Sequence, residues 1–287
     1  MRVLLIVIAL ILIAMPVHAQ VVGLHNFTKK FTAVADMVEA DWSDPVELAR
    51  TWQASVVRIP TGDGFSKIVP MDQLRETLVG ETRKIPTIIY LHGCSGLWAG
   101  SLRRVRFFAD NGFLVIAPAS FARKKFPKSC DPATHSGGLY RGTLKIRQFD
   151  AGHAIEEARK LPFVDPNNIF LVGLSQGAIT TATFEPRNDQ QRVSARVVEG
   201  WTCNAGWFEY AGIKAPDNEP VLTLVGAKDP WFQHPITKGD CGFYVNEKNG
   251  SRSIVFKDGP LASEHALLDF KEPKRLVLDF LKRQMAQ

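Results

Sequence analysis

The stretch NIFLVGLSQGAIT, Asn168 to Thr180, is the point from which the rest of the chain can be interpreted. It begins as an apolar run of strand length and then places Ser175 between two glycines, before residues that can open a helix. Gly173 to Gly177 is a G-x-S-x-G pattern, which is typical of a sharp strand-to-helix turn that lifts a serine hydroxyl clear of its own backbone. Gly173 and Gly177 flank this turn, and we expect that a Cβ at either position would crowd the neighbouring strand and helix. The alternative is an ordinary glycine-rich turn after a buried strand.

Apolar runs and helical spacing alternate along the rest of the chain. Expected strands cover residues 55–60 (a first edge strand), 87–91, 113–117, 169–172, 195–198, 221–225 and 253–256. Expected helices cover 71–79, 101–111, 143–161 and 269–285. This alternation predicts an α/β fold, with a mostly parallel central sheet and helices on both faces. Ser120 to Gly142 is a long loop, and long loops in compact domains are usually functional or mobile.

The N-terminus is predicted to be a signal peptide. A short basic start precedes the uncharged run Val3 to Ala14, and Val17 and Ala19 occupy the small-residue positions of a cleavage site. An uncleaved anchor is the alternative, but the run is short for a bilayer span of about 20 residues. We therefore expect a signal peptide at 1–19, an N-terminal extension at 20–54 that is partly helical around 32–38, and one catalytic domain at 55–287. The protein is expected to be exported, periplasmic or secreted, with no stable membrane insertion after cleavage.

The four cysteines fit an oxidising compartment. An even count without a C-x-x-C pair favours disulfides over metal or redox use. We expect Cys94 to pair with Cys130 and Cys203 with Cys241, because each pair joins loops expected on the same edge of the sheet. Unpaired buried thiols are the alternative.

The net charge of +6 is modest, and the sequence contains no recognisable nucleic-acid-binding motif. Nucleic acid is therefore not an expected partner, and no metal or cofactor is predicted. The clusters Arg103-Arg104-Arg106 and Arg123-Lys124-Lys125-Lys128 are expected to be solvated surface.

A serine nucleophile in such a sheet needs an acid and then a base, each just past a later strand. Asp229 follows the expected strand 221–225, and His265 lies between the last strand and the last helix. His265 would accept the Ser175 proton, and Asp229 would hold the imidazole in the correct tautomer. Glu199 is the competing acid and His234 the competing base, although His234 shares a loop with Asp229.

The negative charge that develops on an attacked carbonyl oxygen needs preorganised N–H donors. One expected donor is the backbone N–H of Gln176, directly after the serine. The other is the N–H of Cys94, which follows His92-Gly93 at the end of the strand 87–91.

With these motifs in place, the chain resembles the dienelactone hydrolase branch of the α/β-hydrolase family. The resemblance rests on YLHGCSGL (Tyr90 to Leu97), GLSQGA (Gly173 to Ala178), GAKDPW (Gly226 to Trp231) and SEHALL (Ser263 to Leu268). It implies the α/β-hydrolase fold, with Ser175, Asp229 and His265 as nucleophile, acid and base. Members of that branch are cytosolic and have cysteine where this chain has Ser175. The resemblance therefore implies a serine carboxylesterase rather than an enzyme for dienelactone itself.

The expected function is hydrolysis of a small-molecule or polymeric ester, or a lactone, through an acyl-enzyme. Trp201, Trp207 and Trp231 are expected at the mouth of the site, where they would favour an apolar or aromatic acyl group, unless they serve ordinary packing. The basic long loop would instead favour an anionic substrate. A peptidase or acyltransferase with the same triad, and an exported binding protein without catalysis, are the alternatives.

Overall fold

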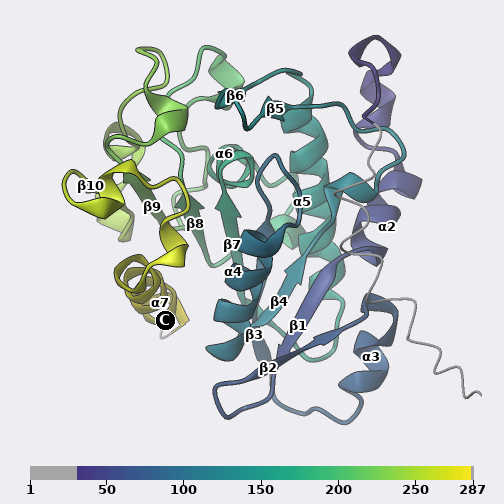
Figure 1. Ribbon diagram of the computed structural model, residues 1–287. Coiled ribbons are helices and arrows are strands. Elements are labelled where there is room, and N and C mark those ends of the chain that lie inside the picture. The colour runs from purple at the N-terminus through teal and green to yellow at the C-terminus, as the bar shows by residue number, and fades with distance from the viewer. Residues whose placement is uncertain (1–30, 286–287) are drawn as a thin grey trace, which may run out of the picture.

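The computed structural model describes residues 31–285, so the expected signal peptide at 1–19 lies outside the described residues. An eight-stranded sheet runs in the order β10-β9-β8-β7-β3-β4-β1-β2 (Figure 1). Its strands are β1 Val56–Pro60, β2 Ser66–Val69, β3 Ile85–Leu91, β4 Leu114–Ala117, β7 Val164–Leu174, β8 Ala195–Glu199, β9 Val221–Gly226 and β10 Arg252–Phe256. The α-helices are α2 Pro45–Gln53, α3 Leu74–Thr77, α4 Ala99–Asp110, α5 Thr143–Arg159, α6 Gln176–Thr183 and α7 Lys271–Met285.

The sheet is parallel from β4 to β10, as the sequence predicts, and β1 pairs antiparallel with both β4 and β2. The expectation that β1 forms the edge is wrong, because β2 pairs with its outer side. β2 is short, and only Val69 at its end is buried, which is common in edge strands. Such a strand carries no alternating apolar pattern, so the sequence did not reveal it.

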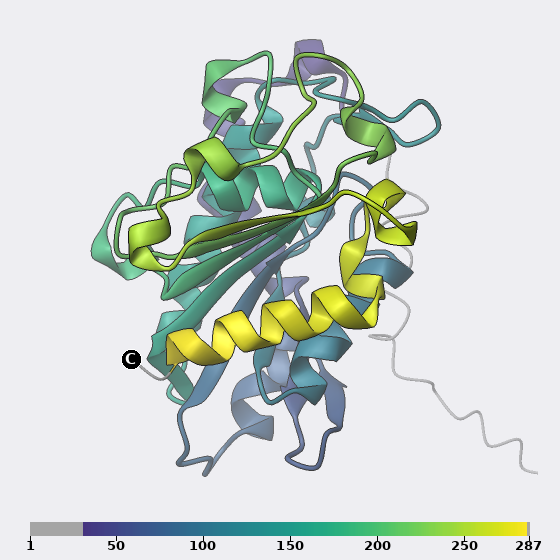
Figure 2. The same ribbon diagram turned by 90° about the vertical axis from the view of Figure 1, so that its left-hand side faces the viewer.

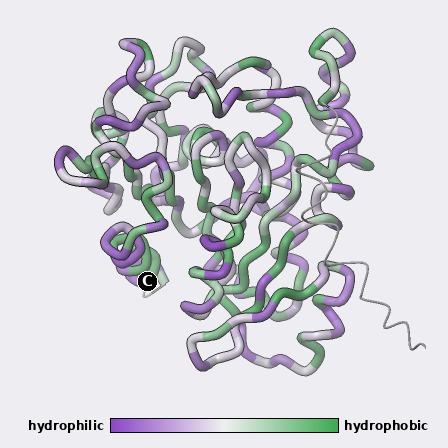
Figure 3. The backbone as a smooth tube through the Cα atoms, in the orientation of Figure 1, coloured by the Kyte–Doolittle hydropathy of each residue, from purple (hydrophilic) through white to green (hydrophobic). Residues whose placement is uncertain are grey.

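Helices cover both faces of the sheet. Side chains of α4 and α7 pack with Ile88 and Phe170 on one face, and those of α2 and α5 pack with Ile89 and Leu171 on the other. α6 belongs to the second face and packs against β7 and β8. In Figure 2, α7 lies along one face of the sheet. In Figure 3, hydrophobic residues concentrate on the central strands. Alternate residues of the buried strands thus pack against the helices on opposite faces of the sheet.

The region expected as an N-terminal extension contains α2, which the sequence analysis did not predict. The Asp44 carboxylate caps this helix by accepting the Val46 N–H at 2.8 Å, and Pro45 occupies its first turn. Leu48 and Trp52, one turn apart, are buried on the side that faces α5. The helix expected around residues 32–38 is a single 3-10 turn, η1 Val34–Asp36.

Both expected disulfides are present, Cys94–Cys130 and Cys203–Cys241. They fit a protein that folds in an oxidising compartment. Between residues 31 and 285, the structure has no helix with the length and apolar character needed to cross a membrane.

The second basic cluster is only partly the solvated surface that was expected. Arg123 is buried, and its guanidinium donates two hydrogen bonds to Asp150 Oδ1, at 3.0 and 2.6 Å. It also donates to the carbonyl oxygens of Asp41 and Trp42. Arg123 therefore joins the N-terminal segment to α5, while Lys124, Lys125 and Lys128 are exposed.

Candidate active site

Ser175 occupies the sharp turn between β7 and α6, with a left-handed backbone at φ 58° and ψ −119°. Its N–H donates to the Glu199 carbonyl of β8 at 2.9 Å, which fixes the turn against the sheet. A Cβ at Gly173 would collide with the backbone carbonyl of Gly177, and a Cβ at Gly177 would collide with that of Leu91. Both glycines are thus required by close packing, and a strained serine backbone at this position is the geometry of a nucleophile elbow.

Asp229 and His265 lie together although they are far apart in the chain. Asp229 is fully buried, and its Oδ2 lies 2.7 Å from His265 Nδ1. Its Oδ1 accepts the Trp231 N–H at 3.0 Å, so both carboxylate oxygens are engaged. An ionised carboxylate only accepts hydrogen bonds, so Nδ1 carries the proton and Nε2 has the free lone pair. Nε2 is buried and makes no hydrogen bond with any of the described residues.

Gly200 allows the His265 loop to approach the end of β8. It has φ +68°, and a Cβ there would lie 2.7 Å from the His265 carbonyl and 3.2 Å from its ring. The Ser175 N–H donates to the carbonyl of Glu199, the residue before Gly200. Ser175 and His265 therefore both lie against the backbone at residues 199–200. His234, the competing base, is exposed, and its Nδ1 accepts the N–H of Ile236.

Glu199, the competing acid, is instead held in a buried ion pair. Its carboxylate receives a two-point contact from Arg104 of α4, with distances of 2.6 and 2.8 Å, and both side chains are fully buried. Glu199 also accepts the N–H of Leu268 at 2.7 Å, three residues after His265. The expectation that Arg104 is solvated surface is therefore wrong. Burial disfavours the charged guanidinium, but the Glu199 carboxylate outweighs burial and raises the pKa of Arg104.

The residues expected to supply the oxyanion donors are Cys94 and Gln176. A Cβ on Gly93 would lie 3.5 Å from Ser175 Cβ, so the loop that carries Cys94 approaches Ser175 closely. The Gly93 carbonyl faces Gly96 N and His92 Nδ1, at 3.1 and 2.7 Å. In a trans peptide the C=O and the N–H point in opposite directions, so the Cys94 N–H points away from Gly96 N and His92 Nδ1. Gln176 is the first residue of α6, where backbone N–H groups have no partner within the helix.

A buried cation supports this loop, and the sequence analysis missed it. Arg147 of α5 donates from Nη2 to the His92 carbonyl at 2.8 Å, and its Nη1 lies 3.0 Å from His92 Nδ1. Desolvation, together with the neighbouring Arg147 charge, holds the pKa of His92 well below its ordinary value of 6.5. His92 is therefore a neutral ring that donates to the Gly93 carbonyl.

The three expected aromatic residues have different surroundings. Trp231 stacks on the His265 ring, with centroids 5.4 Å apart and planes 28° apart. Trp201 is 3% exposed and packs edge-on against Phe232, so it belongs to the interior rather than to the mouth of the site. Trp207 is partly exposed and packs on Tyr210.

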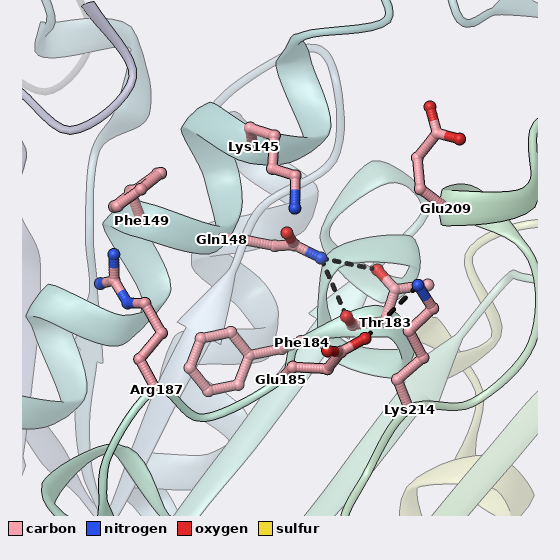
Figure 4. Close-up of a pocket in the computed structure, with 9 residues that line it drawn as sticks. All are labelled: Lys145, Gln148, Phe149, Thr183, Phe184, Glu185, Arg187, Glu209 and Lys214. Carbon is pink, nitrogen blue, oxygen red and sulfur yellow. Dashed lines mark hydrogen bonds and ion pairs between the residues drawn. The ribbon is translucent and has the colours of Figure 1, made fainter. Parts of the chain in front are cut away.

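A cavity of about 180 Å³ lies near the other end of α6 and is not part of this site. Its walls include Thr183 and Phe184 at the end of that helix, together with Lys145 of α5 (Figure 4). Ser175 precedes the first residue of the same helix, so about 12 Å of helix separates the two places.

The parallel sheet, the serine elbow at the end of β7, and an acid and a histidine that each follow a later strand define an α/β-hydrolase fold. No family model matches the chain, and no curated protein sequence matches it.

Several solved structures are similar to this one. A dienelactone hydrolase-like promiscuous phosphotriesterase from metagenomic libraries is 18% identical, with 81% of this chain and 98% of that chain covered and a TM-score of 0.48. A thermophilic esterase from Thermogutta terrifontis is 14% identical, with 80% and 88% covered and a TM-score of 0.48. An acylaminoacyl peptidase from Pyrococcus horikoshii is 17% identical, with 71% and 38% covered and a TM-score of 0.45.

Proposed function

We propose that this protein is an exported serine hydrolase that cleaves a carboxylic ester or lactone through an acyl-enzyme on Ser175. The observation that carries the proposal is the buried Asp229–His265 hydrogen bond, which leaves His265 Nε2, near the serine elbow, without a hydrogen-bond partner in the part of the chain that the structure describes. The oxidising compartment is supported by the two disulfides and by the N-terminal sequence.

In the proposed first step, His265 Nε2 takes the proton of Ser175 Oγ while that oxygen attacks the ester carbonyl carbon. The N–H groups of Cys94 and Gln176 stabilise the oxyanion of the tetrahedral intermediate. Collapse of this intermediate breaks the carbonyl carbon–alkoxy oxygen bond, and the alcohol leaves with the proton that His265 returns. Asp229 stabilises the imidazolium at each stage.

Water then replaces the alcohol in the second half of the reaction. His265 takes a proton from water, and the resulting hydroxide oxygen attacks the acyl carbon. The bond to Ser175 Oγ breaks, His265 returns the proton to the serine, and the carboxylic acid is released. No redox step or cofactor is involved.

The test is hydrolysis of p-nitrophenyl esters with short to long acyl chains, by the mature protein and by Ser175→Ala. Ser194→Ala is the matched control, because Ser194 precedes β8 at the opposite end of the sheet and its hydroxyl donates to the Asn167 carbonyl. Turnover is expected in the parent and the control and not in Ser175→Ala. Turnover that persists in a folded Ser175→Ala variant would refute the nucleophile.

Three outcomes would favour the alternatives. A peptidase with the same triad would also cleave peptide anilides, whose amide bond a simple esterase leaves intact. An acyltransferase would give a transfer product when a second alcohol is added. Absence of turnover on every ester, with an intact fold and no labelling by a fluorophosphonate, would favour a non-catalytic binding protein.

A further inference from the structure

The hairpin of β5 and β6, residues 130–138, is attached to both sides of the candidate site. β5 Cys130–Asp131 pairs antiparallel with β6 Ser136–Gly137, inside the long loop that follows β4. Cys130 is disulfide-bonded to Cys94, the residue after Gly93, which closely approaches Ser175. One end of the hairpin is therefore covalently fixed beside the proposed oxyanion donors.

The tip of the hairpin reaches the histidine side of the site. The His135 ring packs edge-on against Trp231 with centroids 5.3 Å apart, and the Trp231 ring in turn stacks on His265. His135 has a left-handed backbone at φ 51°, a conformation that few side chains adopt without cost. In Figure 2 this loop, the teal hairpin at the upper right, lies beside the short helix η7 Pro230–Phe232 that carries Trp231.

The hairpin is also stiffened internally. The Asp131 carboxylate accepts the Ala133 N–H at 3.1 Å, and the Leu139 N–H donates to the Ser129 carbonyl across its base at 3.1 Å. Beyond β6, a Cβ at Gly138 would lie 3.1 Å from the Trp207 ring, so the chain rests closely on that indole. The hairpin is therefore bonded internally, fixed at Cys130 by the disulfide, and packed against Trp231 and Trp207.

We infer that His135 and Trp231 form the wall of the alcohol subsite and disfavour esters whose alcohol group is as bulky as naphthyl. The inference rests on the proposed function. In the triad reaction His265 gives its proton to the departing alcohol, so that group must lie next to the His265 ring. Trp231 stacks on this ring, and His135 at the tip of the hairpin packs edge-on against Trp231. The acyl group, on the far side of the carbonyl carbon, does not meet this wall.

The test compares methyl, phenyl and 2-naphthyl esters of one short carboxylic acid. His135→Gly removes the ring and accepts the positive φ without strain. Ala133→Gly is the matched control, since it loosens the same hairpin tip but leaves the contact with Trp231 intact. We expect His135→Gly to raise kcat/KM for the naphthyl ester relative to the methyl ester by about tenfold, the lower end of what a change in an apolar pocket gives. Ala133→Gly should stay within about twofold of the parent ratio.

The outcomes separate this inference from the proposed function. If the parent hydrolyses the methyl ester, Ser175→Ala does not, and His135→Gly keeps the parent ratio, the wall is refuted and the esterase stands. An equal rise in both glycine variants would show that flexibility, not the His135 ring, sets the limit, and would also refute the inference. If the folded parent hydrolyses none of these esters, both proposals fail.

Discussion

Replacing Arg104 is expected to lower the free energy of unfolding strongly. The sequence alone places this residue in a basic surface cluster, but its side chain is fully buried. In Arg104→Met, the fully buried Glu199 carboxylate would retain, among residues 31–285, only the Leu268 N–H as a hydrogen-bond partner. Breaking a buried ion pair by removing one partner costs about 3–5 kcal/mol. For a domain of this size, that loss corresponds to a Tm lowered by about 10 °C.

Arg103→Met is the matched control, because Arg103 is the preceding residue and, like Arg104, forms an ion pair with Asp269. Its side chain is 56% exposed, so its ion pair should contribute less than about 1 kcal/mol. Urea unfolding followed by circular dichroism at neutral pH measures both variants. Arg104→Met/Glu199→Leu should recover part of the loss, since it removes the unpaired charge as well. Equal, small losses in the two single variants would refute the buried-pair argument.

Three further predictions concern the site. Asp229→Asn should lower kcat for esters by about 10⁴-fold, because the amide favours the wrong His265 tautomer; a loss below tenfold would contradict this role. Gly200→Ala should destabilise the fold by about 1–3 kcal/mol and reduce kcat, because φ +68° and the His265 carbonyl leave no room for a Cβ; unchanged urea midpoint and kcat would refute this. Since the folded-state pKa of His92 lies below 6.5, the unfolded chain binds a proton that the native state does not, and stability should fall as pH drops below that value. His92→Gln should flatten this dependence in urea midpoints at about pH 7.5 and about pH 5.5, and an unchanged slope would contradict the assignment.

The residues that local sequence reveals are those whose turn or strand end is itself distinctive. Ser175 lies in a glycine-bounded elbow, and Asp229 and His265 follow later strands in the order that this sheet requires. The disulfide pairs follow from loops that leave the same sheet edge. The central strands are evident because they are buried on both faces and are apolar throughout.

The features that sequence did not reveal depend on partners that are distant in the chain. Arg104 and Glu199 are 95 residues apart, and neither lies in a pattern that indicates burial. Arg147 and His92 are 55 residues apart, and Arg147 lies in a helix that also carries exposed charges such as Lys145, so its local sequence does not indicate burial. Only α2 had an overlooked local signal, the Asp44-Pro45 start followed by apolar residues one turn apart.

The most direct test of the central claim is to label the folded protein with a fluorophosphonate and locate the adduct by mass spectrometry of its tryptic peptides. Ser175 is the only serine between Leu161 and Arg187, a segment that trypsin releases as one peptide. The proposed mechanism predicts a single adduct on this peptide, lost in Ser175→Ala. An adduct on another peptide, or no adduct in a protein that hydrolyses esters, would contradict it.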